Sequence, residues 1–332
     1  MVDITHTTIS VIIPTYNRKH ELEPLLHSLN HQTLLPSQYE IIVVDDGSTD
    51  ETTEWLTAHK DQFKIKTSFY TKAHGGPGAA RNLGMEMAAG DIFAFIDTDC
   101  IAQPEWLEQL IKPFISKKVG AVGGRESINE KDPLLMRCFH YLMISPLTTG
   151  GLRGKKGKTL ARFYPRTFNM AISRGAYQAT GGFKKMFHAE DVELSYRIRH
   201  KGFDLTYQDS AQVYHRRRSK ISQFVMQLFH MGKARVTLAR LHPSSLEFLH
   251  VLPALALTIV VLLSILSLTW QPAFSLLKLF GGFAILLIVL IGIDGALRLH
   301  SFRALFLTPL LFMLQQAAYG SGFLISLLTP KR

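Results

Sequence analysis

The stretch IIVVDDGSTD, residues 41–50, runs four apolar residues directly into two adjacent carboxylates and a turn. A continuous apolar run of this kind is typical of a buried strand in a parallel sheet. The Gly-Ser-Thr-Asp that follows predicts a tight turn that caps a helix. Asp45 and Asp46 therefore lie at the carboxyl end of a strand, the edge at which open α/β sheets bind ligands. One of the two could simply cap the next helix, but capping does not account for both.

Strand and helix patterns alternate around this stretch. TTISVIIPTYNR at 7–18 predicts a strand that runs into a proline-containing turn, and the leucines of the next segment have helical spacing. A helix around Thr52–His59 and a strand in IKTSFYT at 65–71 follow the opening strand. Such alternation requires parallel strands joined by right-handed crossovers. We therefore expect an α/β fold with a mostly parallel sheet flanked by helices, and the strand ends lining one crevice.

A glycine-rich turn, GGPGAARNLG at 75–84, precedes a helix that is predicted to begin near Ala79. Such a turn can receive a phosphate at the helix N-terminus. It matches neither the Walker pattern nor GxGxxG, so a loop that needs glycine to turn is an equally good interpretation. The first strand and its turn also lack the glycine fingerprint, which disfavours a Rossmann oxidoreductase.

A second buried strand ends in carboxylates in DIFAFIDTDC, residues 91–100. In an extended backbone, Asp97 and Asp99 would project from the same side. That arrangement suits a hard divalent cation whose coordination shell is completed by substrate phosphates. A DxD triplet is common by chance, but one at the end of a core strand is a more specific signal, and it predicts a metal site.

Four stretches in this order, SVIIPTYNR, IIVVDDGSTD, GGPGAARNLG and FIDTDC, resemble family 2 glycosyltransferases of the GT-A fold. The resemblance continues through FNMAISRGAYQATGGFKKMFHAEDVELSYRIRHKG at 168–202. It implies transfer of a sugar from a nucleoside diphosphate donor of the UDP or GDP type, with inversion at the anomeric carbon. It also implies Mn2+ or Mg2+ as cofactor, because a bound cation neutralises the charge that develops on the leaving diphosphate.

By this resemblance, Pro14, Thr15 and Tyr16 wall the nucleoside pocket. Asp46 contacts the nucleobase, and Asp45 orders the loop or aids nucleoside binding.

The resemblance also assigns the metal end of the site. Arg81 contacts the donor or braces Asp97, and Asp97 is directed to the ribose or sugar. Asp99 is expected to bind the metal directly, with Asp97 and His215 as further candidates. A histidine beside three arginines could equally be a solvated or phosphate-facing residue.

Asp191, in HAEDVELSYRIR, matches the catalytic base of the family. A carboxylate within hydrogen-bond reach of the acceptor hydroxyl can contribute about 10²- to 10⁴-fold in rate. The acidic cluster Glu190, Asp191 and Glu193 also suits the first turn of a helix that ends at Gly202, and the two interpretations are compatible.

The function expected from these residues and this resemblance is transfer of a sugar to a hydroxyl of a lipid-linked or membrane-proximal acceptor. Two alternatives remain. A polyprenyl-phosphate sugar synthase would have a phosphate acceptor and less need for a base, so the Glu-Asp pair favours a hydroxyl acceptor. A catalytically inactive membrane scaffold or transport partner is disfavoured by the presence of Asp46, Asp97, Asp99 and Asp191. The chain also lacks the QxxRW motif of processive synthases, which weakens a polymerase interpretation.

The composition changes near residue 246, beyond which apolar residues dominate. Segments 251–270, 274–293 and 305–328 are long enough to cross a hydrocarbon core of about 30 Å. The third, which contains Gln315 and Gln316, could instead be re-entrant or packed against its neighbours.

We therefore expect a GT-A domain at 1–218, an amphipathic interfacial helix at 219–245 and a membrane region at 246–332. The interfacial helix has apolar residues at 221, 224, 225, 228 and 229 and basic residues elsewhere.

The net charge of +11 predicts an anionic partner. Basic clusters lie in RGKKGK at 153–158 and HRRRSK at 215–220, and no nucleic-acid motif accompanies them. Membrane lipids or a phosphorylated substrate are therefore the expected partners, and nucleic acid is not. The resemblance to glycosyltransferases adds a lipid-linked or membrane-proximal glycan acceptor as an expected partner.

The charge pattern around the spans indicates a catalytic domain on the cytoplasmic side of a prokaryotic cell membrane. Lysine and arginine crowd the segment before the first span and are absent from TWQPAFS after it. The first ten residues lack a signal-peptide pattern. Cys100 and Cys138, without a CxxC spacing, suit a reducing compartment and argue against a zinc site.

Overall fold

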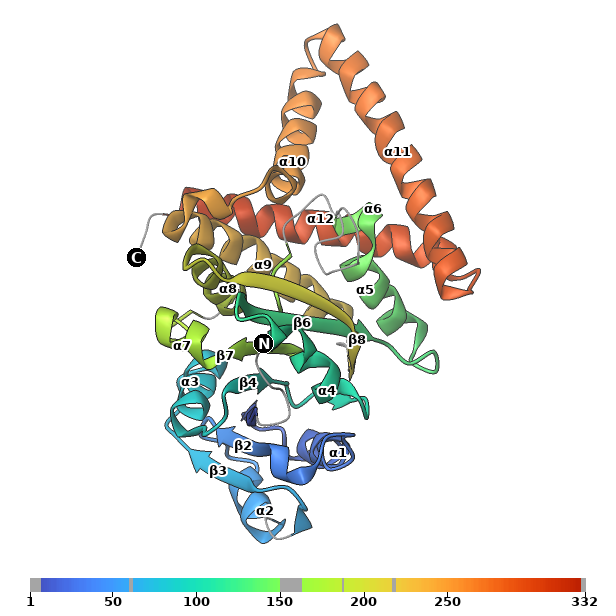
Figure 1. Ribbon diagram of the computed structural model, residues 1–332. Coiled ribbons are helices and arrows are strands. Elements are labelled where there is room, and N and C mark those ends of the chain that lie inside the picture. The colour runs from blue at the N-terminus through green and yellow to red at the C-terminus, as the bar shows by residue number, and fades with distance from the viewer. Residues whose placement is uncertain (1–6, 60–61, 150–162, 187, 217–218, 330–332) are drawn as a thin grey trace. The chain divides into compact units, whose positions relative to one another are not determined.

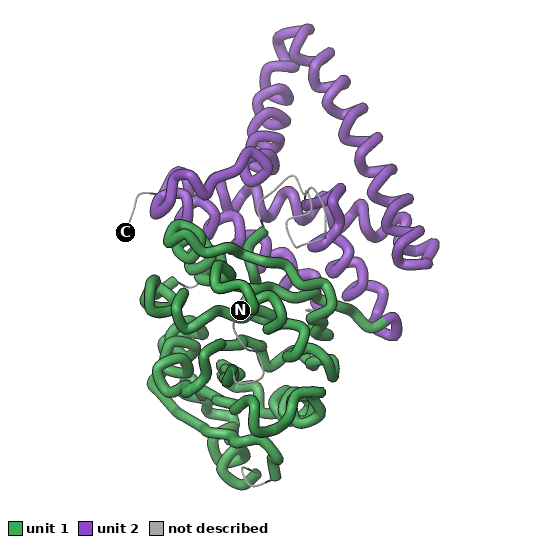
Figure 2. The backbone as a smooth tube through the Cα atoms, viewed as in Figure 1, with its two compact units in different colours: residues 1–129, 154–157, 163–216 green, residues 130–153, 158–162, 217–332 purple. Residues whose placement is uncertain are grey.

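The computed structural model describes residues 7–59, 62–149, 163–186, 188–216 and 219–329 of the 332-residue chain. The chain divides into two compact units, coloured separately in Figure 2. Unit 1 comprises residues 1–129, 154–157 and 163–216, and unit 2 comprises 130–153, 158–162 and 217–332. The basic cluster at 153–158, and Arg217 and Arg218 of the second cluster, lie outside the described residues.

Among the described residues, unit 1 contains one eight-stranded sheet in the order β3-β2-β1-β4-β7-β6-β8-β5 (Figure 1). β1 pairs in parallel with β2 and β4, and β3 pairs in parallel with β2. β7 is antiparallel to both β4 and β6, β8 is parallel to β6, and β5 is antiparallel to β8. The expected mostly parallel sheet is confirmed. The strands are β1 Ile9–Thr15, β2 Tyr39–Asp45, β3 Thr67–Thr71, β4 Ile92–Phe95, β5 Cys100–Ala102, β6 Val119–Ser127, β7 Met170–Ser173 and β8 Asp204–His215.

Helices flank this sheet. They are α1 Lys19–Leu29, α2 Thr52–His59, α3 Pro77–Met87, α4 Trp106–Ile111, α7 Arg174–Thr180 and α8 Glu190–His200, with short 3-10 turns at η2 Pro36–Gln38 and η4 Lys112–Ile115.

The apolar run of β2 is buried on both sides of the sheet. Ile41 and Val43 enter one apolar cluster together with the leucines of α1. Ile42 and Val44 enter a second cluster together with residues of α3 and α8. Because successive side chains of a strand point to opposite faces, a strand covered on both faces must be apolar throughout. This explains why four apolar residues precede Asp45.

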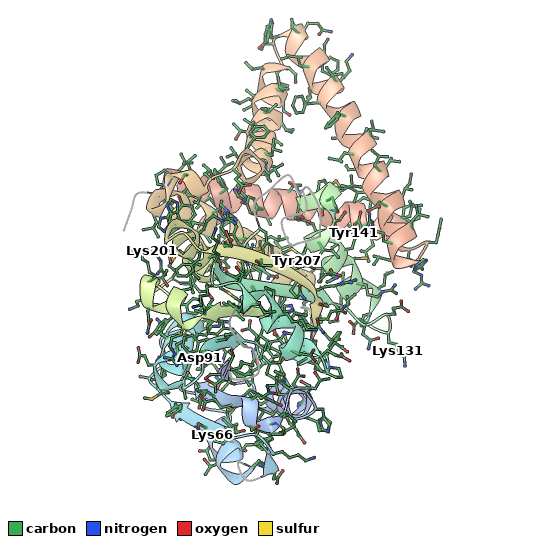
Figure 3. All side chains as sticks on the ribbon, viewed as in Figure 1. Lys66, Asp91, Lys131, Tyr141, Lys201 and Tyr207 are labelled. Atoms are coloured by element: carbon green, nitrogen blue, oxygen red, sulfur yellow. The ribbon has the colours of Figure 1, made fainter. Side chains whose placement is uncertain are left out.

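Unit 2 is helical in its described residues. Its elements are α5 Leu134–Ile144, α6 Pro146–Thr149, α9 Ile221–Leu241, η5 Pro243–Ser245, α10 Phe248–Leu266, α11 Gln271–Leu299 and α12 Ala304–Leu328. By length and composition, α10, α11 and α12 can each cross a membrane. Figure 3 shows side chains projecting outward along the length of α10 and α11. α12 is more enclosed by protein, with 44% of its apolar window buried against 11% for each of the other two.

α9 and α12 pack closely along each other. A Cβ on Gly232 would collide with the carbonyl oxygen of Tyr319, and a Cβ on Gly322 would collide with that of Phe229. Glycine on each helix therefore lets the two backbones approach. This contact places the third apolar segment against its neighbours, as one interpretation of its sequence expected.

The packing of α9 departs from the expected membrane-surface helix. Phe224 and Leu228, on its apolar face, are each only 2% exposed and lie in a cluster with residues of α5, α11 and α12. Phe224 stacks on Phe139 of α5 at 4.2 Å between ring centroids. The same helix leaves Ile221 and Met226 exposed. Its apolar pattern therefore serves a protein contact, which an isolated helical pattern cannot distinguish from a lipid contact.

Candidate active site

The ends of β1 and β2 lie side by side, with Thr15 in register with Asp45. Pro14 and Thr15, expected in a turn, are instead the last two residues of β1. Thr15 is buried, and its hydroxyl has no hydrogen-bond partner in the structure. Tyr16 follows directly and is 42% exposed. The three residues expected to wall a nucleoside pocket are thus at the carboxyl edge of the sheet, and Tyr16 is partly open to solvent while His74 stacks on its ring.

Asp45 holds the turn that follows β2. Its Oδ1 accepts a hydrogen bond from the backbone N–H of Ser48 at 3.0 Å, and its Oδ2 accepts one from the hydroxyl of Thr53 at 2.6 Å. These bonds tie the end of β2 to the first turn of α2, as an Asx-type turn does.

Asp46 is enclosed by the loop that follows β3. Its Oδ1 accepts from Lys72 Nζ at 2.7 Å and from the N–H of Gly75 at 3.0 Å. Its Oδ2 accepts from the N–H of Gly76 at 2.7 Å and lies 2.9 Å from Nδ1 of His74. The glycine-rich turn therefore directs two backbone N–H groups at a carboxylate of this chain. If this turn bound a phosphate, as one interpretation of its sequence suggested, these two N–H groups would be free to bond to that ligand. In the structure they bond to Asp46 instead.

Arg81 of α3 joins the DxD triplet to the acidic start of α8. Its guanidinium donates to Asp97 at 2.6 Å and to Glu190 at 3.3 Å, and the residue is 2% exposed. Burial and the neighbouring Asp191 raise the pKa of Glu190 to about 7, although Arg81 acts in the opposite direction. The arginine thus links the DxD segment to the Glu-Asp pair in one buried network.

The DxD segment is a turn between β4 and β5, not an extended strand end. The N–H of Cys100 donates to the carbonyl of Asp97 at 3.1 Å, and this bond closes the turn. The two carboxylates consequently have different partners. Asp97 faces Arg81, and Asp99 faces His215, whose Nε2 lies 3.4 Å from Asp99 Oδ1.

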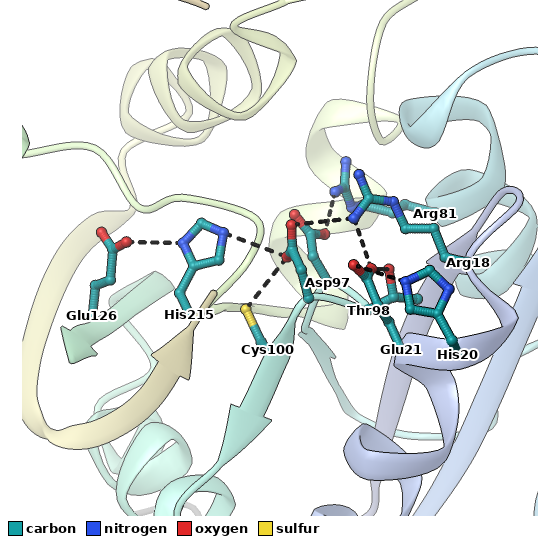
Figure 4. Close-up of polar contacts among 10 residues, drawn as sticks. Arg18, His20, Glu21, Arg81, Asp97, Thr98, Cys100, Glu126 and His215 are labelled. Carbon is teal, nitrogen blue, oxygen red and sulfur yellow. Dashed lines mark hydrogen bonds and ion pairs between the residues drawn. The ribbon is translucent and has the colours of Figure 1, made fainter. Parts of the chain in front are cut away.

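Both ring nitrogens of His215 face a carboxylate (Figure 4). Its Nδ1 lies 2.8 Å from Glu126 Oε1, and Phe168 stacks on the ring at 4.7 Å. Burial lowers the pKa of His215, but the bonds to Asp99 and Glu126 outweigh it and raise that pKa to about 9. Pairing of β5 with β8 places Cys100 opposite His215, so the sheet itself brings the histidine to the triplet.

The residues around Asp99 fit a divalent cation. Ligand atoms of Asp99, Cys100 and His215 lie within 4.8 Å of one another. A carboxylate oxygen suits both Mn2+ and Mg2+, and an imidazole nitrogen suits Mn2+ once the ring has lost the proton that Asp99 and Glu126 stabilise. The thiol is a poor ligand for either, because burial raises the pKa of Cys100 well above its usual value and keeps it protonated.

Asp191 is the second residue of α8 and lies close to the guanidinium of Arg166. Nη1 of Arg166 lies 3.4 Å from its Oδ1 and 3.5 Å from its Oδ2. The residue before the helix, Ala189, has a positive φ of 63°, which marks a sharp entry into α8. The candidate base therefore stands at the very start of the helix, next to Glu190 and paired with Arg166.

Comparison with known proteins gives the family. The model for glycosyl transferase family 2 matches residues 10–181, just over half of the chain. The chain belongs to glycosyltransferase family 2. The glycosyltransferase AglE of Haloferax volcanii is 27% identical over 250 residues, which cover 72% of this chain and 76% of that protein.

Two further relatives match different lengths of this family 2 chain. The validoxylamine A glucosyltransferase of Streptomyces hygroscopicus subsp. limoneus is 37% identical over 222 residues, covering 60% of this chain but only 49% of that protein. The mannosyltransferase PcManGT from Pyrobaculum calidifontis, solved with GDP-Man and Mn2+, superposes with a TM-score of 0.69 at 19% identity. That superposition covers 98% of this chain and 89% of PcManGT, so the similarity in fold includes the apolar helices that follow the GT-A-like domain.

Several site residues of this family 2 chain were not expected from its sequence. Four residues that contact the expected site residues come from segments without a recognisable motif. They are Lys72 and His74, which contact Asp46, Glu126, which contacts His215, and Arg166, which contacts Asp191. The one available signal for Glu126 is its place on β6, a strand whose first half is apolar, since a carboxylate that such a strand buries needs a partner. The other three are on irregular segments or in a short bridge, where local sequence gives no such signal.

Proposed function

We propose that the protein is a metal-dependent, inverting glycosyltransferase that moves a sugar from a nucleoside diphosphate to a hydroxyl of a lipid-linked or membrane-proximal acceptor. The observation that carries this proposal is the network from Asp97 through Arg81 to Glu190, which adjoins Asp191. Asp99, the other carboxylate of the DxD turn, pairs with His215. Such a network holds a donor-binding turn and a carboxylate base at fixed positions. The Mn2+ and GDP-Man in the PcManGT structure support a nucleotide sugar and a divalent cation.

Each part of the site has a task in this proposal. Asp191 takes the proton from the acceptor hydroxyl as the oxygen attacks the anomeric carbon, and Arg81 holds Asp97 toward the donor sugar. Asp99 and His215 would hold Mn2+ or Mg2+, which when bound offsets the negative charge of the leaving diphosphate. The three apolar helices would place the acceptor beside the membrane, with the catalytic unit on its cytoplasmic side.

Arg166 favours a second candidate, a polyprenyl-phosphate sugar synthase. A guanidinium 3.4 Å from Asp191 can bind an anionic acceptor as well as brace a base. A phosphate acceptor is already ionised at neutral pH and does not depend on Asp191 for deprotonation.

The test is a panel of UDP and GDP sugars incubated with the purified full-length protein, Mn2+ and membrane lipids, followed by mass analysis of the lipid products. We expect one donor to yield a glycosylated lipid, with Asp191→Asn lowering kcat by about 10²- to 10⁴-fold and leaving donor binding intact. Asp209→Asn is the control, because Asp209 is an exposed carboxylate on β8, whereas Asp191 is on α8. A sugar-phosphate product whose formation survives Asp191→Asn would favour the synthase, and absence of any nucleotide-sugar turnover would contradict the proposal.

A further inference from the structure

The carboxylate of Asp46 has no acceptor site left for a ligand. A carboxylate offers about four lone-pair positions. Four donors already occupy them, namely Lys72, His74 and the N–H groups of Gly75 and Gly76. The Asp46 side chain is only 3% exposed, so no further direction of approach is open. A nucleobase N–H can therefore reach Asp46 only after one of these donors has left.

Of the four donors, His74 is the one that can leave. The two backbone N–H groups are held where the chain enters α3. Lys72 also bonds to the carbonyl of Ala73, and its side chain is 22% exposed. The His74 side chain is 56% exposed and can rotate into solvent without moving the backbone. Displacement of His74 frees one lone pair on Oδ2 of Asp46.

His74 also covers the aromatic face that a nucleobase would use. Its ring stacks on Tyr16 with centroids 4.3 Å apart and planes inclined by 29°. The imidazole therefore makes the two contacts expected of a base in this pocket, stacking on Tyr16 and donating an N–H to Asp46. Stacking of a base on an aromatic side chain contributes about 1 to 3 kcal/mol, so a ring that blocks it is an effective competitor.

We propose that His74 occupies the nucleobase position in the donor-free protein and is displaced by the nucleotide. This inference rests on the proposed function, because it assumes a nucleotide donor. His74 acts as an internal competitor that lowers apparent affinity for every nucleotide by the fraction of molecules in which it fills the pocket. Because this factor is the same for every base, His74 leaves the choice of base to Asp46 and Tyr16.

The test is calorimetric titration of the full-length protein in detergent and Mn2+ with UDP, GDP and inorganic diphosphate. We expect His74→Ala to bind its preferred nucleotide about 3- to 10-fold more tightly than wild type, because the competing ring is gone. Affinity for inorganic diphosphate should not change, since that ligand has no base. Tyr16→Ala should weaken nucleotide binding.

His59→Ala is the matched control, because His59 also stacks on an aromatic ring, that of Trp55 at 4.6 Å, and both residues lie on α2. It should leave all three affinities unchanged, and the melting temperature of each variant checks its fold. Unchanged or weaker nucleotide binding by a folded His74→Ala variant would overturn the inference, since it would mean that the ring supports the base. Failure of the wild type to bind any nucleotide would instead count against the proposed function.

Discussion

Glu126 is a single buried carboxylate on which the orientation of His215 depends. A ligating histidine usually donates its other ring N–H to a carboxylate, which fixes the tautomer and turns the free nitrogen to the metal. The 2.8 Å contact at Nδ1 has this arrangement and leaves Nε2 directed at Asp99.

We therefore expect Glu126→Gln to lower Mn2+ affinity about 10- to 100-fold, with little effect on the melting temperature. Electron paramagnetic resonance of free Mn2+ during titration measures this directly, without an activity assay. Glu108→Gln, at a carboxylate on α4 that bonds to Thr33, is the control and should bind Mn2+ as wild type does. Equal affinities in the two variants would show that His215 does not need Glu126 for metal binding.

Glu190 gives a prediction about pH. Its folded-state pKa is raised from the ordinary value of 4.5 to about 7 by burial and by Asp191. The folded state then binds the proton more tightly than the unfolded chain does, so its stability falls as pH rises from about 4.5 to 7.

We expect Glu190→Gln, which cannot ionise, to flatten this decline. Melting temperatures of the detergent-solubilised protein across that pH range, compared between wild type and variant, measure the difference. Parallel curves would mean that Glu190 titrates normally and that Arg81 balances its burial.

At the scale of elements, the contact between α9 and α12 rests on two small positions. Backbone carbonyls face the missing side chains of Gly232 and Gly322, and a carbonyl cannot rotate away as a side chain can. We expect Gly322→Val to force the helices apart and to destabilise the protein by about 1 to 3 kcal/mol.

Thermal melting in detergent measures this effect. Gly281→Val in α11 is the matched control, because nothing lies within 4 Å of a Cβ built there. A similar loss in both variants would point to helix propensity, not to the helix contact, as the cause.

The positions of helices and strands were more predictable from the sequence than the tertiary contacts that these elements make. The helix Thr52–His59 and the strand IIVV were expected where they lie, because periodicity and capping are local properties. The DxD segment was expected to be extended, but a bond between Cys100 and Asp97 folds it into a turn. Phe224 and Leu228 were assigned to lipid, since the helix that covers them, α12, begins 63 residues after α9 ends. Asp45, Asp46, Asp97, Asp99 and Asp191 could be selected as site residues from motifs, whereas Glu126 and His74 depend on tertiary contacts.

At the scale of the molecule, we expect unit 2 not to tolerate removal of its last three helices. A chain ending at Leu241 lacks α10, α11 and α12, so the faces of α5 and α9 around Phe224 and Leu228 lose part of their cover. We expect this truncated protein to self-associate, as measured by light scattering in detergent-free buffer. Replacing both residues with serine should reduce the association. A monodisperse truncated protein would show that α5 and α9 cover each other sufficiently.

The course of synthesis is constrained by the bond between Tyr141 and Asp294. The tyrosine hydroxyl lies 2.8 Å from the Asp294 carboxylate, and 153 positions separate the two residues along the chain. At about 5 to 20 residues per second, a ribosome needs roughly 8 to 30 seconds to pass from one to the other. During that interval α5 has left the ribosome without the helices that bury it. We therefore expect nascent chains stalled between Leu241 and Gln271 to recruit chaperones or the insertion machinery through α5, a dependence that crosslinking from residues of α5 would reveal.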